Sequence, residues 1–242
     1  MGSITTTVLI LGMHRSGTSS LAGTLQQHGL YLGNVFEWNP YNLKGNRENE
    51  KIMFLNDEVL MENGGNWHNP PVAIEWNSEL ANKRDKIIQT FTESSALLWG
   101  FKDPRTVITL PFWKDGLCNI KMVGSFRHPL LVAQSLNART PTMSIPYGLE
   151  LWKRYNTQLL LYFEQKKFPI ISFDASPQEY QSSLNYIIDY LGLNKTPVNQ
   201  NIPFFDVALR NQNTIDGIEK IPDEILDLYE KLCQIYQRWF IL

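Results

Sequence analysis

The chain has 242 residues, of which 43% are hydrophobic and 19% are charged, and its formal net charge is −2. This composition predicts a single globular domain over residues 1–242, and the nearly balanced charge provides no general attraction to nucleic acid or to an anionic membrane. Apolar runs such as Leu159–Phe163 are far shorter than the ~20 residues that span a bilayer, so we expect no membrane span. Cys118 and Cys233 match no metal or disulfide pattern, so we expect a reduced, cytoplasmic protein.

The first predicted element is a strand that leads through a glycine-bounded loop into a helix. Residues 7–11 are a short apolar run typical of a buried strand, and a helical pattern resumes after Gly17. The N–H groups and the dipole of a helix start favour a bound phosphate. The ATP-binding loop G-x-x-x-x-G-K-S/T has a lysine where this chain has Thr18, and the positive charge lies three places earlier, at Arg15. We therefore expect a phosphate-type ligand other than Mg-ATP bound in the usual way.

The rest of the chain alternates predicted strands with predicted helices. Residues 31–33 are a candidate short strand. The later predicted strands are at residues 96–102, 121–126 and 169–173, and the helical patterns are near residues 52–60, 80–91, 130–139, 149–166, 177–191 and 222–239. This order predicts the α/β class, a three-layer sandwich with a mostly parallel central sheet in a P-loop NTPase-like arrangement. Ligands of such sheets bind where strands end, here near Gly12, Phe101 and Arg127.

One group of polar residues follows the predicted strand at 121–126. Arg127 ends the strand, Pro129 suits the first turn of a helix, and Ser135 lies eight residues after the arginine. A rigidly held guanidinium and a hydroxyl are suitable donors for one more phosphate. A strand-end ion pair and a solvent-facing serine would explain the same residues.

A second polar group follows the predicted strand at 96–102. The segment GFKDPRTVITLPFW places Lys102, Asp103 and Arg105 at the strand end, just before a helix. A loop salt bridge explains Asp103 and Arg105 as well as catalysis does. Lys102 is expected to point toward the same crevice as Arg15.

Together these segments resemble the sulfotransferases that use 3′-phosphoadenosine 5′-phosphosulfate (PAPS). MHRSGTSS is similar to the family's 5′-phosphosulfate loop, commonly P-K/R-S-G-T-T/S, and FRHPLLVAQS is similar to its 3′-phosphate signature. KDP after a central strand is similar to the lysine-bearing turn of the tyrosylprotein and bacterial branches. The three pieces span residues 7–136 in the family's order. The resemblance implies metal-independent transfer of a sulfonate from PAPS to a hydroxyl or amine, with 3′-phosphoadenosine 5′-phosphate (PAP) as the product.

The resemblance also implies roles for individual residues. Arg15 falls on the basic residue that contacts the bridging or sulfonate oxygens, and Lys102 falls on the lysine that stabilises the transferring sulfonate. Arg127 and Ser135 fall on the 3′-phosphate pair. The late R-K-G motif of cytosolic animal members is missing, so Arg210 is the candidate for a third 3′-phosphate contact. The cofactor-binding candidates of the loop and helix start are His14, Ser16, Gly17, Thr18 and Ser19.

The general base is not assigned by the resemblance, because Pro104 stands where cytosolic animal members have the histidine of K-T-H. Glu48 is the first candidate, since residues 42–48 are similar to the N-x-x-G-x-x-E stretch of bacterial members and are expected to face the crevice. A carboxylate stabilised by a helix dipole explains Glu48 equally well. The next candidates, in order, are Glu37, Asp103 and His14.

Aromatic residues crowd the segment 36–76, and they suggest an acceptor region. They could line an apolar pocket or a sugar-stacking surface, or simply pack beneath long loops, while Tyr155 on a later helix could reach the site. The sequence leaves the acceptor open, as a small molecule or a carbohydrate. Two other functions stay open as well, a nucleotide kinase-like P-loop enzyme and a non-catalytic PAP-binding protein. The segment includes Trp38, Tyr41, Trp67, His68 and Trp76.

Overall fold

The computed structural model describes residues 5–38, 44–94, 96–198, 204 and 220–241. Within these residues, the centre of the molecule is a sheet of four parallel strands in the order β2-β1-β3-β4. The strands are β1 (Thr6–Leu11), β2 (Leu98–Lys102), β3 (Ile120–Phe126) and β4 (Ile170–Ser172). The predicted α/β class with a parallel central sheet is confirmed.

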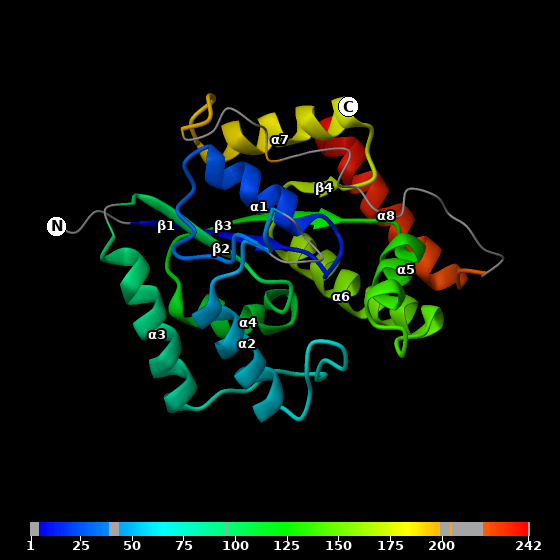
Figure 1. Ribbon diagram of the computed structural model, residues 1–242, viewed down its shortest axis with the longest axis horizontal. Coiled ribbons are helices and arrows are strands. Elements are labelled where there is room, and N and C mark those ends of the chain that lie inside the picture. Colours follow the sequence, from blue (N-terminus) through cyan, green and yellow to red (C-terminus); the bar gives the residue numbers. More distant parts are fainter. Residues whose placement is uncertain (1–4, 39–43, 95, 199–203, 205–219, 242) are drawn as a thin grey trace.

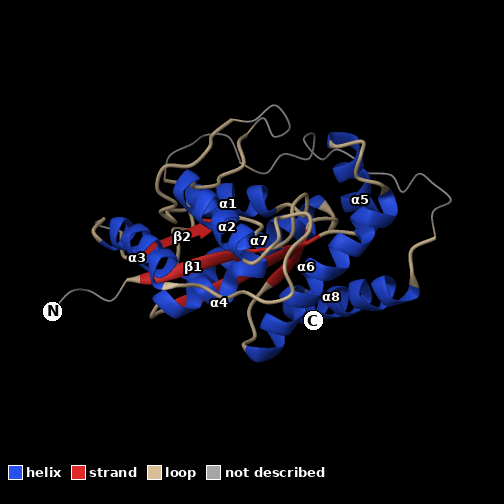
Figure 2. Cartoon of the chain, turned by 90° about the horizontal axis from the view of Figure 1, so that it is seen from below, coloured by secondary structure: helices blue, strands red, loops and turns tan. Residues whose placement is uncertain are grey.

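Helices cover both faces of the sheet (Figure 1), and Figure 2 shows the strands passing between them. On one face lie α1 (Thr18–Gln27) and α7 (Pro177–Leu191). Around the other face lie α2 (Glu50–Glu62), α3 (Ser78–Thr92), α4 (Thr106–Gly116) and α6 (Ile145–Gln165). The remaining helices, α5 (Pro129–Arg139) and α8 (Asp223–Phe240), both pack against α6. The result is the predicted three-layer sandwich.

Strand β1 shows how the sequence produces these layers. Successive side chains of a strand point to opposite faces. Val8 and Ile10 are buried under α1 and α7, whereas Leu9 and Leu11 are buried in the cluster of the opposite face. A strand covered on both faces must be apolar throughout, which is why it appears in the sequence as an unbroken apolar run.

Two segments differ from the sequence-based expectation by more than a shift of one or two residues at an end. Residues 31–33 contribute only an isolated bridge between Tyr31 and Trp99. Helix α6 begins at Ile145, before the predicted start, because the Ser144 side chain caps its first turn. None of the helices in the described part of the chain is long and apolar enough to cross a bilayer.

The register of the sheet brings the strand ends together at one edge. Ile10 of β1 pairs with Lys102 of β2, and Leu11 pairs with Gly124 of β3. The segments that follow all four strands therefore leave the sheet on the same side. These segments carry the polar residues that the sequence places at strand ends.

Candidate functional site

The loop between β1 and α1 depends on two glycines. Gly12 and Gly17 have φ angles of +149° and +82°, which favour a residue without a side chain. Gly12 also lies directly against the Ser125 carbonyl of β3, and Gly17 lies against the Phe173 ring after β4, so a Cβ atom at either position would collide. The loop is thereby pressed onto the ends of two neighbouring strands.

This loop has the features of an anion cradle. Among the described residues, no side chain caps the N-terminus of α1 at Gly17, and the buried Ser16 hydroxyl has no hydrogen-bond partner. The Ser125 hydroxyl of β3 donates to the Ser16 carbonyl and holds the loop in place. Helix N-terminal N–H groups and a hydroxyl at one point are suitable partners for a phosphate.

Arg15 joins the loop to the polar group that follows β3. Its backbone is left-handed, with φ +67°, and its Nε donates to Ser135 Oγ on α5 over 2.8 Å. Burial lowers the pKa of Arg15 to about 10, and the positive charges of Arg139 and Arg127 act in the same direction. Three guanidinium groups therefore converge at this edge, where an anion would relieve their repulsion.

Arg127 lies directly after β3 and is held from several sides. Its Nε pairs with Asp174 Oδ1 at 3.2 Å, and its guanidinium lies 5.4 Å from the centroid of the Phe173 ring. The indole N–H of Trp152 donates to the Arg127 carbonyl over 2.9 Å. The arginine predicted to bind a 3′-phosphate is thus part of a strand-end ion pair, and its partner Ser135 is bonded to Arg15.

A buried ion pair lies at the end of β2. Lys102 Nζ and Glu48 Oε1 are 2.6 Å apart, and their side chains are only 1% and 10% exposed. Glu48 precedes Asn49, whose side chain caps α2. Removing both charges from water is costly unless the geometry compensates for it, so this pair points to a specific role at the sheet edge.

Asp103 and Arg105 form the loop salt bridge that the sequence also allows. Arg105 donates to the buried Asp103 carboxylate through its backbone N–H at 2.8 Å and through its guanidinium at 3.2 Å. Arg105 Nε also pairs with Asp57 of α2 at 2.6 Å. Burial raises the pKa of Asp103 to about 6 against the opposing charge of Arg105, and Glu48 adds to the rise.

His14 faces the aromatic segment. Its ring centroid lies 4.6 Å from that of Trp67 and 6.1 Å from that of Tyr155. Burial lowers the pKa of His14, and the nearby charges of Arg105 and Lys102 lower it further, so the imidazole is neutral at pH 7. The Tyr155 hydroxyl of α6 donates to the Trp67 carbonyl over 2.7 Å and so holds the Trp67 backbone against this helix.

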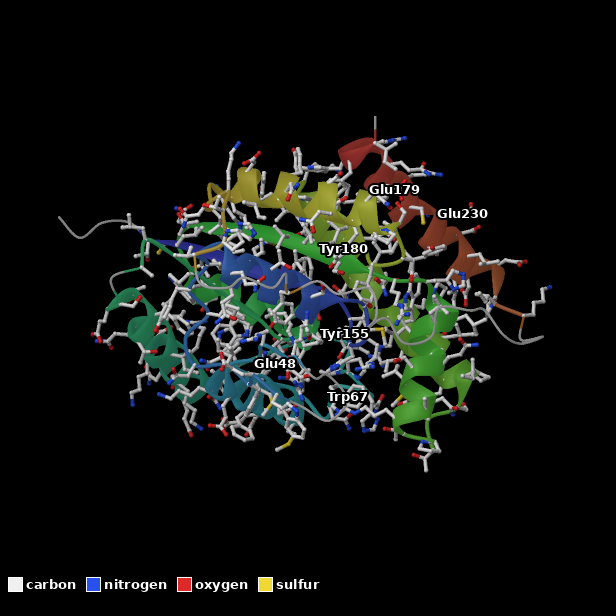
Figure 3. All side chains as sticks on the ribbon, turned by 45° about the horizontal axis from the view of Figure 1, so that its top comes forward. Glu48, Trp67, Tyr155, Glu179, Tyr180 and Glu230 are labelled. Carbon is white, nitrogen blue, oxygen red and sulfur yellow. The ribbon has the colours of Figure 1, made fainter. Side chains whose placement is uncertain are left out.

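The Lys102–Glu48 ion pair lies near the aromatic contacts of His14 with Trp67 and Tyr155. In Figure 3, Glu48, Trp67 and Tyr155 lie in the lower part of the molecule, while Tyr180 lies on the opposite side of the sheet. His14 connects the two features, because its ring contacts Trp67 and the nearby charge of Lys102 contributes to lowering its pKa.

Several predicted residues lie away from this centre. Glu37 is 75% exposed and pairs with Arg47. Ser19 donates its hydroxyl to the Asn46 carbonyl at 3.1 Å, and Trp76 packs against Phe112. Arg210 lies outside the described residues, and so do Tyr41 and the beginning of the 42–48 stretch.

Sequence reasoning missed three residues that contact or flank the arginine cluster, Arg139, Phe173 and Asp174. Arg139 lies one helical turn after Ser135 on α5, a spacing that could have suggested it. Phe173 and Asp174 follow the short strand β4, where a lone carboxylate has the appearance of a solvated loop residue.

Comparison with known proteins supports the fold. No family model matches the chain, and no curated protein sequence matches it. The structure is similar to the sulfotransferase domain from the Synechococcus PCC 7002 olefin synthase, with a TM-score of 0.60, 18% identity and coverage of 96% of both chains. It is also similar to the sulfotransferase domain from the curacin biosynthetic pathway, with a TM-score of 0.58, 15% identity and coverage of 93% of this chain and 96% of that domain. The chain therefore has the sulfotransferase fold.

Proposed function

We propose that this protein is a PAPS-dependent sulfotransferase that sulfonates a hydroxyl or amine of a small-molecule or carbohydrate acceptor. The observation that carries the proposal is the 2.8 Å hydrogen bond from Arg15 Nε to Ser135 Oγ. It joins the residue expected at the 5′-phosphosulfate to a residue expected at the 3′-phosphate, although 120 positions separate them. The buried Ser16 hydroxyl and the lowered pKa of Arg15 fit an anionic ligand at the same point.

The donor would lie along the edge of the sheet. The loop N–H groups and the start of α1 would hold the 5′-phosphate, and Arg127 would bind the 3′-phosphate. Arg15 and Lys102 would stabilise the charge that develops on the sulfonate and on the leaving phosphate oxygen. A transferring sulfonate carries less charge than a phosphoryl group, so donors of this kind can serve without Mg²⁺.

The chemical step would be an in-line displacement at sulfur. The acceptor oxygen or nitrogen forms a bond to the sulfur as the bond from sulfur to the phosphate oxygen of PAPS breaks, and PAP leaves with the electron pair. Glu48 would take the acceptor's proton. Its carboxylate lies 2.6 Å from Lys102 Nζ, so the base and a sulfonate-binding cation would occupy the same end of the site.

Ligand-dependent melting distinguishes this function from a nucleotide kinase. PAP at a hundredfold excess over its Kd is expected to stabilise the native state by about 2.7 kcal/mol, whereas ATP with Mg²⁺ stabilises much less. Equal stabilisation by ATP that requires Mg²⁺ would support the kinase function instead. In a second assay, labelled PAPS is incubated with small-molecule and carbohydrate acceptors. PAP binding without transfer to any of them would favour the non-catalytic binding protein.

A further inference from the structure

The Asp174 carboxylate, just after β4, contacts both the Arg127 side chain and the start of α5. Its Oδ1 pairs with Arg127 Nε at 3.2 Å, and its Oδ2 accepts the backbone N–H of His128 at 2.5 Å. His128 is the residue that precedes the first turn of α5. One carboxylate therefore fixes the plane of the Arg127 guanidinium relative to the helix that carries Ser135.

Phe173 connects the same arginine to the phosphate loop. Its ring lies under the Arg127 guanidinium, with 5.4 Å between the ring centroid and Cζ, and it occupies the space beside Gly17 that a Cβ atom would enter. Its backbone N–H donates to the Phe126 carbonyl over 2.8 Å, and the Tyr180 ring packs against it edge-on. The ring is therefore a fixed spacer between Gly17 and Arg127.

We propose that Phe173 and Asp174 are positioning residues that set the distance and angle between the two phosphate subsites, and so select a donor that carries a 3′-phosphate. The inference rests on the proposed function, because it assumes a PAPS-type donor. An arginine side chain has considerable rotamer entropy, and a guanidinium already held in plane loses less of it when it binds. The negative charge of Asp174 also offsets the mutual repulsion of Arg127 and Arg15, which allows both to face one ligand.

The test compares PAP with 5′-AMP, which keeps the 5′-phosphate and lacks the 3′-phosphate. In Asp174→Ala, the Kd of PAP measured by calorimetry is expected to rise by about tenfold, since a charge-assisted hydrogen bond orients Arg127, while the Kd of 5′-AMP stays within about twofold. Asp174→Asn keeps an acceptor oxygen and removes the charge, and its PAP affinity is expected between those of Asp174→Ala and the natural protein. Asp189→Ala is the matched control. It removes an exposed carboxylate in the last turn of α7, which pairs with Lys195 beyond the helix. This variant is expected to change neither Kd.

The outcomes separate the inference from the proposed function. If the natural protein does not prefer PAP over 5′-AMP, the proposed function and this inference both fail. If that preference exists and Asp174→Ala retains it, or if the variant weakens both ligands equally, only the positioning role is overturned. Should Asp174→Ala fail to fold, Asp174→Asn decides by the same ratio of affinities, because a general loss of structure would not act on PAP alone.

Discussion

Replacing Glu48 by glutamine tests the buried ion pair at the end of β2. Glu48→Gln keeps the shape of the side chain and an oxygen that can accept from Lys102, but it removes the negative charge and the basic carboxylate. The proposed function makes two separable claims about this change. The protein should lose some stability, and it should lose turnover in a way that depends on the acceptor.

The stability effect follows from the burial of both partners. Lys102 is almost completely buried and its Nζ lies 2.6 Å from Glu48 Oε1. Breaking a buried pair by removing one partner costs about 3–5 kcal/mol. Because glutamine keeps a hydrogen bond, we expect a loss of about 1–3 kcal/mol, which corresponds to a fall in Tm of about 2–4 °C per kcal/mol in a chain of this length.

The catalytic effect is expected to be larger. Removing a general base lowers turnover by about 10²–10⁴, equivalent to about 3–5 kcal/mol of activation free energy. PAP affinity should change by no more than about twofold, since PAP lacks the sulfonate that Lys102 is proposed to contact. The loss should be smaller with a phenol than with an aliphatic alcohol, because a phenol ionises near pH ~10. Turnover is measured with labelled PAPS well below the Tm of the variant.

The matched variant changes the other partner of the pair. Lys102→Met leaves Glu48 as a buried carboxylate without its cation, so it should destabilise by about 3–5 kcal/mol and lower turnover with phenols and alcohols alike. Near-normal turnover of Glu48→Gln with an aliphatic alcohol would refute the base assignment. Asp103 and His14 would then be the next candidates, ahead of Glu37, which is 75% exposed.

Three further predictions concern the donor site, the absence of a metal requirement and pH. Arg127→Ala should weaken PAP binding by about 2–4 kcal/mol and leave 5′-AMP binding almost unchanged in calorimetry; equal losses would make Arg127 purely structural. EDTA should leave the rate of sulfonate transfer unchanged, and a loss that Mg²⁺ restores would contradict the mechanism. Since burial raises the pKa of Asp103 from 3.8 to about 6, the native state holds this proton more tightly than the unfolded chain. The contribution of Asp103 to the free energy of unfolding should therefore fall as pH rises from about 4 to 6, and denaturant titrations of Asp103→Asn should lack this slope.

Much of the fold was predictable because helices and strands that bury one face carry apolar residues at regular spacings along the sequence. Helix α7 spans Pro177–Leu191 as predicted, since Pro177 follows the Ser176 cap and Gly192 ends the helix in a left-handed conformation. The start of α6 was missed because Pro146 and Gly148 interrupt its apolar pattern, and the cap at Ser144 only becomes evident in the structure. Local signals therefore predict an element more reliably than its first turn.

The site was predictable only in outline. Parallel strands bring their carboxyl ends to one edge, so the sequence could place Arg15, Lys102 and Arg127 at the same edge without any contact being known. It could not predict that Ser135 accepts from Arg15 or that Lys102 pairs with Glu48, because these contacts join positions 120 and 54 residues apart. Asp174 left no signal at all, since its role depends on the packing of β4 beside β3.

The strand order of the sheet arranges the proposed chemistry along one line. Lys102 follows β2 with Glu48 beside it, the loop with Arg15 follows β1, Arg127 follows β3, and Asp174 follows β4. In the proposed function, these positions across the order β2-β1-β3-β4 would contact the acceptor, then the sulfonate and 5′-phosphate, and then the 3′-phosphate. The sulfonate, 5′-phosphate and 3′-phosphate of a PAPS-type donor have the same linear order, so one extended donor with an acceptor beside its sulfonate could engage every strand end. A ligand that carried only one phosphate would contact only one part of this row of charges, so we expect a donor phosphorylated at both positions.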